Sequence, residues 1–174
     1  MPQAILHPLQ QHVSVTMQVN GQTITRTVEA RMHLADFLRD VLGLTGSHVG
    51  CEHGVCGACT LRIDGAIMRG CLVLAAQLDG ASVETIEGLT TGGEFADLQE
   101  AFVARNALQC GFCTPGMVMC ASELLTRQPN AGREQIREFI SGNYCRCTGY
   151  EAIVDAIETT AAARSRDGAP RKSA

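Results

Sequence analysis

The sequence predicts an α+β fold, in which a small mixed sheet comes first and a helical domain follows. Polar and apolar residues alternate in residues 13–19, which is typical of a half-buried strand. After residue 95 the apolar residues instead recur every three or four positions, as on one face of a helix. The break falls near Glu87-Gly88-Leu89. The chain has 174 residues, of which 45% are hydrophobic, so it has enough apolar residues for two small cores.

The first half is expected to contain two hairpins, a further strand and one helix. Asn20-Gly21 suits a two-residue type I′ turn, because both residues tolerate positive φ, and Asp64-Gly65 marks a second turn. The predicted strands are residues 13–19, 22–28, 59–63, 66–69 and 82–86. The predicted helix has apolar residues at helical spacing and ends at Gly43; these residues are Leu34, Phe37, Leu38 and Val41.

The second half is expected to contain four helices. The first has an apolar stripe that runs from Phe95 to Phe102. The second begins at Thr114-Pro115, where a capping hydroxyl precedes a proline suited to the first helical position. The third ends near Gly142. The fourth begins at Thr148-Gly-Tyr-Glu151, which has the pattern of a capping box, with hydroxyl and carboxylate each accepting a free backbone N–H.

These patterns divide the chain into five parts. We expect an N-terminal extension, a sheet domain, a linker, a four-helix domain and a flexible tail, at residues 1–12, 13–87, 88–94, 95–163 and 164–174. The first residues have neither a basic segment nor a long apolar segment, so we expect no secretory signal and a cytoplasmic location, with export together with a partner left open.

Composition excludes several classes of function. The net charge of −4 is spread evenly, and aromatic residues make up only 4% of the chain, so we expect no nucleic-acid binding. No apolar run is long enough to span a membrane, so we expect no membrane insertion. Without export, disulfides are a poor explanation for nine cysteines. Metal binding or redox chemistry is the better explanation.

Four cysteines of the first half have the spacing of plant-type [2Fe–2S] ferredoxins. They are Cys51, Cys56, Cys59 and Cys71, and the first three lie in a loop with glycines at 46, 50, 54 and 57. Glycine lets the backbone curl inward, so that N–H groups can approach the cluster sulfurs. A structural zinc site is the alternative, but it usually uses two close cysteine pairs, and only Cys56 and Cys59 are spaced in that way.

Four more cysteines flank the predicted helices of the second half. Cys110 and Cys113 lie between the first two helices, and Cys145 and Cys147 lie between the last two. In an up-down-up-down bundle these connections meet at one end, so the four thiols are expected to converge. They could hold zinc or a second redox centre, and the first cluster favours the second redox centre. The ninth cysteine, Cys120, lies on an apolar stripe and is expected in the core.

Three segments resemble the iron–sulfur subunit of the xanthine oxidase family of molybdenum hydroxylases. They are Gly50-Cys-Glu-His-Gly-Val-Cys-Gly-Ala-Cys59, Gln109-Cys-Gly-Phe-Cys-Thr-Pro-Gly116 and Tyr144-Cys-Arg-Cys-Thr-Gly-Tyr150. The resemblance covers about residues 13–160. It implies a β-grasp, plant-type ferredoxin-like domain followed by a four-helix bundle, with one [2Fe–2S] cluster in each. Cys51, Cys56, Cys59 and Cys71 would ligate the first cluster, and Cys110, Cys113, Cys145 and Cys147 the second.

The resemblance also implies a reaction and partners. A large subunit would bind molybdopterin, as its cytosine dinucleotide, and hydroxylate an aldehyde or an N-heteroaromatic compound. Electrons would pass through the helical-domain cluster and then the ferredoxin-like cluster to FAD on a medium subunit, or to a cytochrome. Gln109 and Cys147 match residues that contact the pterin in relatives. The chain would be a separate, non-catalytic subunit of a heterotrimer or of its dimer.

Two other classes of protein stay open on the residues alone. One is a free-standing two-cluster ferredoxin that diffuses between its partners, against which the evenly spread charge argues. The other is a structural zinc protein that acts as a scaffold in a complex. Iron content, zinc content and co-purifying subunits distinguish these hypotheses.

Overall fold

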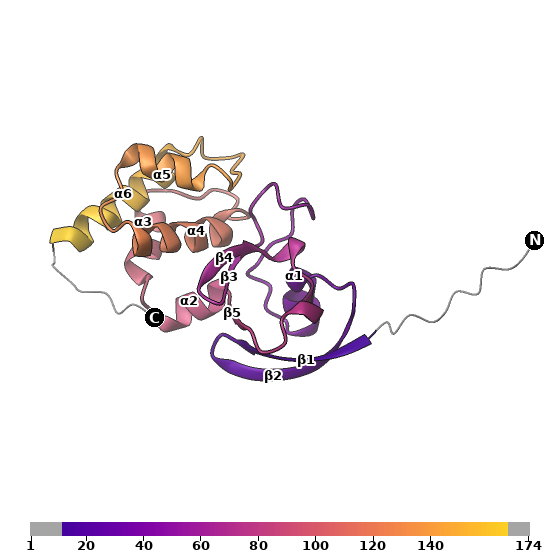
Figure 1. Ribbon diagram of the computed structural model, residues 1–174. Helices are drawn as coiled ribbons and strands as arrows, with labels where there is room; N and C mark the ends of the chain where they lie inside the picture. Colours follow the sequence, from indigo (N-terminus) through magenta and orange to yellow (C-terminus); the bar gives the residue numbers. More distant parts are fainter. Residues whose placement is uncertain (1–11, 167–174) are drawn as a thin grey trace, which may run out of the picture.

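A five-stranded sheet forms the N-terminal part of the molecule, and helices form the C-terminal part (Figure 1). The computed structural model describes residues 12–166, so most of the expected extension and tail lies outside the described residues. The sheet has the order β2-β1-β5-β3-β4. Its strands are β1 (His12–Val19), β2 (Gln22–Glu29), β3 (Thr60–Ile63), β4 (Ala66–Arg69) and β5 (Ser82–Glu84). The predicted α+β class is therefore confirmed.

Both predicted hairpins are present. β1 pairs with β2 in antiparallel register from His12 opposite Glu29 to Val19 opposite Gln22, and β3 pairs with β4. Asn20 and Gly21 have φ values of 50° and 78°, as a type I′ turn requires. β5 joins the hairpins, because it pairs in parallel with β1 and antiparallel with β3. It ends at Glu84, two residues earlier than predicted, because Ile86 begins a helix.

The predicted helix of the first half packs against the sheet, but it changes partway from α-helical to π-helical geometry. It consists of α1 (Leu34–Asp36) and the π-helical segment η1 (Phe37–Val41). The wider turn of η1 closes a hydrogen bond from Leu42 N to Phe37 O and shifts the phase of the side chains. Val41 is therefore 41% exposed, whereas the pattern predicted that it would share the buried face. Gly43, with φ 71°, follows the end of the helix as expected.

The sheet and these helices enclose the first core. Alternate residues of β1 point inward, at Val15, Met17 and Val19, as the period of two predicts. They pack against the apolar face of α1 and η1 and against the central strands. The other buried members of this core are Val28, Leu34, Phe37, Leu38, Leu61, Ile63, Ala75, Leu78 and Val83.

Within residues 12–166, five helices follow the sheet and enclose a second core. They are α2 (Ile86–Gly92), α3 (Ala96–Ala104), α4 (Thr114–Arg127), α5 (Arg133–Ile140) and α6 (Glu151–Arg166). α2 occupies most of the segment 88–94 that was expected to be a linker, and α6 continues three residues into the expected tail. None of the helices within residues 12–166 is long and apolar enough to cross a membrane.

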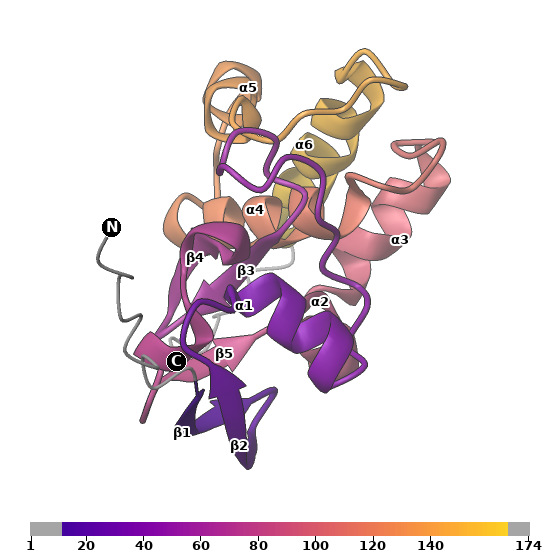
Figure 2. The ribbon, with the colours of Figure 1, turned by 90° about the vertical axis from the view of Figure 1, so that its right-hand side faces the viewer.

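α4 connects the helical part to the sheet (Figure 2). It packs on α3 and α5 within the helical part and on β3 and β4 within the sheet. Ten of its fourteen residues are buried, and eight of these ten are apolar or glycine. The β1–β2 hairpin lies at the far end of the sheet from α5 and α6 (Figures 1 and 2).

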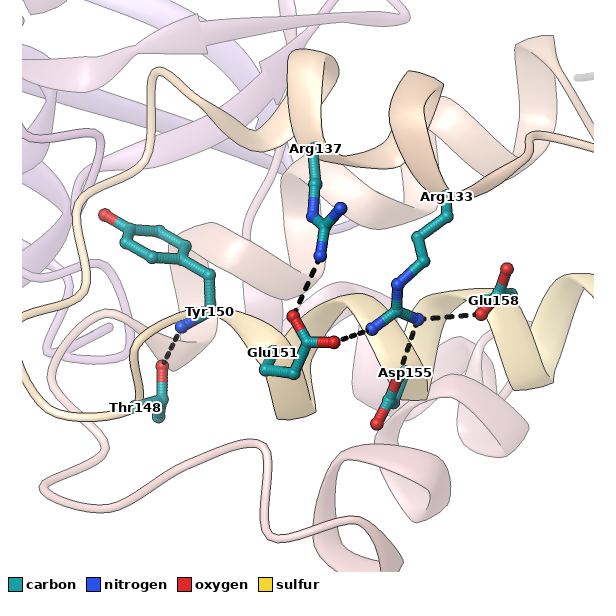
Figure 3. Close-up of polar contacts among 7 residues, drawn as sticks. All are labelled: Arg133, Arg137, Thr148, Tyr150, Glu151, Asp155 and Glu158. Carbon is teal, nitrogen blue, oxygen red and sulfur yellow. Dashed lines mark hydrogen bonds and ion pairs between the residues drawn. The ribbon is translucent and has the colours of Figure 1, made fainter.

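Two predicted helix starts differ in detail. Thr114, which was predicted to cap α4, is instead its first residue, and Cys113 occupies the cap position. The Thr114 hydroxyl is buried without a hydrogen-bond partner among the described residues. At α6, Thr148 Oγ1 accepts a hydrogen bond from Tyr150 N at 3.1 Å, but the Glu151 carboxylate pairs with Arg133 and Arg137 of α5 (Figure 3). The predicted capping box is therefore wrong for Glu151, because two guanidinium groups are stronger partners than a backbone N–H.

Candidate metal centres

All nine cysteines are free thiols, and all lie within the described residues. Eight of them lie in two loop regions, one beside the sheet and one at the helix connections. In the first region Cys59 and Cys71 are buried, and Cys51 and Cys56 are half-buried. In the second region Cys110 and Cys147 are exposed, and Cys113 and Cys145 are half-buried.

The loop before β3 curls around its own cysteines. Gly54 and Gly57 have φ values of 78° and 76°, a left-handed conformation that favours glycine. A Cβ at Gly50 would lie 3.2 Å from Cys56 Sγ, so this position also suits glycine. The curl directs Cys56 N–H at Cys51 Sγ, with an N···S distance of 3.4 Å. Together with the His53 N–H, this bond lowers the pKa of Cys51 to about 6, so the backbone favours a thiolate.

Cys71 returns to the loop from the β3–β4 hairpin. It lies in the 3₁₀ turn η2 (Gly70–Leu72), and Gly70 N donates to Cys59 O at 3.0 Å. The Cys59 and Cys71 thiols are hydrogen-bonded partners. Burial, followed by the Cys59 thiol, raises the pKa of Cys71 to about 11. A buried thiolate at this position therefore needs a cation, which a metal centre supplies.

The second group of thiols comes from two helix connections. Cys110 and Cys113 lie between α3 and α4, and Cys145 and Cys147 lie between α5 and α6. The Sγ atoms of Cys110 and Cys147 are 3.5 Å apart, and the thiols of Cys113 and Cys145 are hydrogen-bonded partners. The structure thus brings together four residues that are up to 37 positions apart in the chain.

The pKa values differ within this second group. Burial, followed by the Cys145 thiol, raises the pKa of Cys113 to about 12. Burial also acts to raise the pKa of Cys145, but several hydrogen bonds outweigh it, and the pKa falls. These bonds come from the Thr148 hydroxyl and from the N–H groups of Thr148 and Cys147. Cys145 is therefore the member of this pair whose surroundings favour the thiolate.

Each group of four thiols consists of two close pairs. The pairs are Cys51 with Cys56, Cys59 with Cys71, Cys110 with Cys147, and Cys113 with Cys145. A binuclear cluster needs two thiolates at each of its two irons, whereas zinc draws all four around one ion. The donor set and its arrangement therefore fit a binuclear iron–sulfur cluster at each site.

The two cysteine regions are in direct contact. Tyr144 N, next to Cys145, donates to Cys56 O at 2.8 Å, so one hydrogen bond joins the two backbones. Asn143 is 2% exposed, and its Nδ2 donates to Gly57 O at 3.1 Å. A Cβ at Gly57 would lie 2.7 Å from Gly142 O, so glycine permits this close approach.

Sequence reasoning missed two residues that organise this region. Asn143 also accepts a hydrogen bond from Arg69 of β4, and Tyr150 Oη accepts one from Cys145 N at 2.9 Å. Both residues lie within five positions of a cysteine whose spacing predicts metal binding. This proximity was the only sign of their role in the sequence. Gln109, expected at a pterin contact together with Cys147, is exposed like Cys147.

Cys120 lies apart from both groups. It is 2% exposed within the helical core, and its Sγ donates to Phe139 O at 3.6 Å. Burial raises the pKa of Cys120 to about 11, so the thiol stays protonated. Its predicted place in the core is confirmed.

Two protein families match consecutive parts of the chain. Residues 17–88 match a 2Fe-2S iron-sulfur cluster binding domain, and residues 85–158 match a [2Fe-2S] binding domain. Fold, thiol groups and family matches together define a protein with two [2Fe–2S] binding domains.

Known proteins resemble the chain over most of its length. It is 54% identical over 145 residues to the nicotine 6-hydroxylase small subunit of Paenarthrobacter nicotinovorans, covering 83% of this chain and 87% of that subunit. It is 51% identical over 160 residues to the caffeine dehydrogenase subunit gamma of Pseudomonas sp. (strain CBB1), covering 88% and 96%. The chain belongs to the small iron–sulfur subunits of the xanthine oxidase family of molybdenum hydroxylases, as its motifs predicted.

Solved structures agree with this assignment. The structure of quinoline 2-oxidoreductase from Pseudomonas putida 86 matches with a TM-score of 0.84 and 51% identity, covering 91% of this chain and 99% of that chain. Aldehyde oxidoreductase from Desulfovibrio gigas matches with a TM-score of 0.80 and 40% identity, but this chain covers only 18% of that chain. The protein is thus the electron-transfer subunit of an oxidoreductase complex.

Proposed function

We propose that the eight paired thiols ligate two [2Fe–2S] clusters. Cys51, Cys56, Cys59 and Cys71 would hold one, and Cys110, Cys113, Cys145 and Cys147 the other. The observation that supports this assignment is the arrangement of each group as two close pairs. Bound there, each cluster supplies a one-electron redox centre.

The chain's own residues hold and shield these centres. The loop before β3 provides N–H groups that stabilise the Cys51 thiolate, and the β3–β4 hairpin brings Cys71 against it. The bond between Tyr144 N and Cys56 O keeps the two ligand loops together. We infer that this contact sets the separation between the centres, because the neighbouring Asn143 Nδ2 adds two buried hydrogen bonds to the first region, one to Gly57 O and one to Thr60 Oγ1.

The domain division belongs to the same proposal. We take residues 13–87 as a β-grasp, ferredoxin-like domain, 88–94 as the linker and 95–163 as a four-helix bundle. Contacts between α3 and α6, α4 and α5, and α5 and α6 support the bundle, because they leave the cysteine connections at neighbouring helix ends. α2 then connects the two domains.

The partners follow from the exposed residues around the thiols. Phe112 and Tyr144, each next to a thiol of the second group, are about half exposed, at 48% and 55%. Exposed aromatic residues beside a buried or half-buried site are typical of interface cores. We propose that this face, with Gln109 and Cys147, contacts a large subunit that carries molybdopterin cytosine dinucleotide. A medium FAD subunit or a cytochrome would accept the electrons, in a cytoplasmic heterotrimer or its dimer.

We propose an N-heteroaromatic substrate for the complex. The relatives named for nicotine, caffeine and quinoline are 51–54% identical to this chain, whereas the aldehyde oxidoreductase is 40% identical. Turnover of quinoline, nicotine and caffeine by the purified complex should exceed turnover of benzaldehyde. A complex that oxidised only aldehydes would contradict this part of the proposal.

Purification of the intact complex through a tag on this chain tests the central assignment. We expect about four iron atoms per chain and two distinct EPR signals on reduction, as two [2Fe–2S] clusters require. Larger subunits should co-elute. About two zinc atoms per chain with little iron would refute the cluster assignment, and elution of the chain alone would favour a diffusing ferredoxin.

A further inference from the structure

The hydroxyl of Thr148 lies against a thiol of the second group. Its Oγ1 is 3.1 Å from Cys145 Sγ, three positions earlier in the chain. Geometry alone allows either atom to donate in such a contact. The direction of this bond is decided by the protonation state of Cys145, because a thiolate can only accept.

Thr148 Oγ1 also accepts a hydrogen bond from the backbone N–H of Tyr150, at 3.1 Å. A hydroxyl has one proton to donate and two lone pairs to accept. Since the Tyr150 N–H occupies one lone pair, the hydroxyl proton is free to point at Cys145 Sγ. When Cys145 is a thiolate it has no proton to offer, so Thr148 is the donor in this contact.

The turn that carries Thr148 is held in place from both sides. Gly149 and Tyr150 have φ values of 66° and 69°, and the resulting curl returns Tyr150 Oη to accept from Cys145 N at 2.9 Å. Left-handed backbone at a tyrosine is uncommon and persists only where surrounding contacts impose it. Thr148 and Tyr150 therefore hold the sulfur and the backbone of Cys145, respectively.

The next residue anchors this turn to the neighbouring helix. Glu151 begins α6 and pairs with Arg137 of α5 at 2.9 Å and with Arg133 (Figure 3). Arg133 also binds Asp155 at 2.6 Å and Glu158 at 2.9 Å, so α5 and α6 are joined along two turns. This network joins the first residue of α6, three positions after Thr148, to α5.

We propose that Thr148 raises the reduction potential of the helical-domain cluster by donating a hydrogen bond to the Cys145 thiolate. This inference rests on the proposed ligand set. Reduction adds one electron and therefore one unit of negative charge, while the Thr148 proton stays on its oxygen. A hydrogen bond to a ligating sulfur stabilises the more negative state more strongly, which favours reduction. Thr148 is thus a positioning residue that acts on the cluster through Cys145.

The test is an EPR-monitored redox titration of the intact complex with Thr148→Val. Valine keeps the shape and removes the donor. We expect the equilibrium constant for reduction of the helical-domain cluster to fall about tenfold, which is 59 mV for a one-electron couple. The potential of the ferredoxin-like cluster should not change. Thr148→Ser, which keeps the hydroxyl, should restore most of the potential.

Thr160→Val is the matched control. Thr160 lies on α6, and its hydroxyl donates to Ala156 O at 2.9 Å instead of to a thiol, so both potentials should stay at their wild-type values. An unchanged potential in a fully loaded Thr148→Val complex would overturn the inference. Loss of the cluster in both Thr148→Val and Thr148→Ala would also overturn it, because Thr148 would then be structural. Absence of the helical-domain signal from the wild-type complex would instead refute the proposed ligand set.

Discussion

The two cysteine regions reach similar arrangements of thiols by different means. In the first, three of the four cysteines lie within nine consecutive residues, and glycines with positive φ curl the loop around them. In the second, two short connections meet only because α3, α4, α5 and α6 pack together. The first site is therefore built mainly by local backbone conformation, and the second by tertiary packing. We therefore expect the two sites to respond differently to single amino-acid substitutions.

The largest expected effect comes from removing one thiol of the second group. Cys113→Ser or Cys145→Ser should abolish the EPR signal of the helical-domain cluster and the reduction of the flavin, or other acceptor, by substrate. The signal of the ferredoxin-like cluster should persist, because its loop does not depend on those thiols for its curl. EPR of the reduced complex and stopped-flow reduction by substrate measure both effects. Substrate reduction of the acceptor at the wild-type rate would contradict the proposed electron route.

The next effect tests the glycine-dependent loop of the first region. Gly57→Ala should destabilise the chain by about 3 kcal/mol or more, since it combines a left-handed φ with a Cβ that would lie 2.7 Å from Gly142 O. Gly80→Ala is the matched control, because Gly80 has φ 80° but no atom within 4 Å of an added Cβ. It should cost only about 1 kcal/mol. Denaturant unfolding of both variants measures the difference, and equal costs would show that the close approach of the loops is unimportant.

A smaller effect is expected at the ninth cysteine. Cys120→Ala leaves a small cavity in the helical core and should cost about 1 kcal/mol of stability. Both EPR signals should remain at full intensity, because the Cys120 thiol bonds to a backbone carbonyl and lies apart from the paired thiols. Iron analysis and EPR check this. Loss of either signal would mean that the ligand assignment is wrong.

The smallest effect concerns acid stability of the helical region. Arg137, followed by Arg133, holds the pKa of Glu151 below its usual value of 4.5. A depressed carboxyl pKa stabilises the fold above pH 4.5, and this contribution is lost as the pH falls through the lower, folded-state value. Glu151→Gln should therefore lower the melting temperature slightly at pH 6 and reduce its decline between pH 4.5 and more acidic values. Identical pH profiles for the two proteins would show that these ion pairs do not affect stability.

The comparison of the two regions also explains which predictions from sequence succeeded. The hairpin turns and the cysteine spacing of the first loop depend on neighbouring residues, so Asn20-Gly21 and the glycines around Cys56 could be interpreted directly. Val41 was placed wrongly because a change to π-helical winding depends on packing and leaves little trace in the apolar pattern. Glu151 was placed wrongly because its partners lie on another helix.

The sequence by itself determined the α+β class, the spacing that divides eight of the cysteines into two sets of four, and the family. These depend on short-range features, namely residue spacing and backbone preference, which a single segment contains. Only the tertiary structure decided how the thiols pair, that Asn143 and Tyr144 join the two loops, and that the Thr148 hydroxyl contacts Cys145. Those contacts depend on where separate segments meet, because hydrogen bonds act over about 3 Å and exist only after the helices have packed.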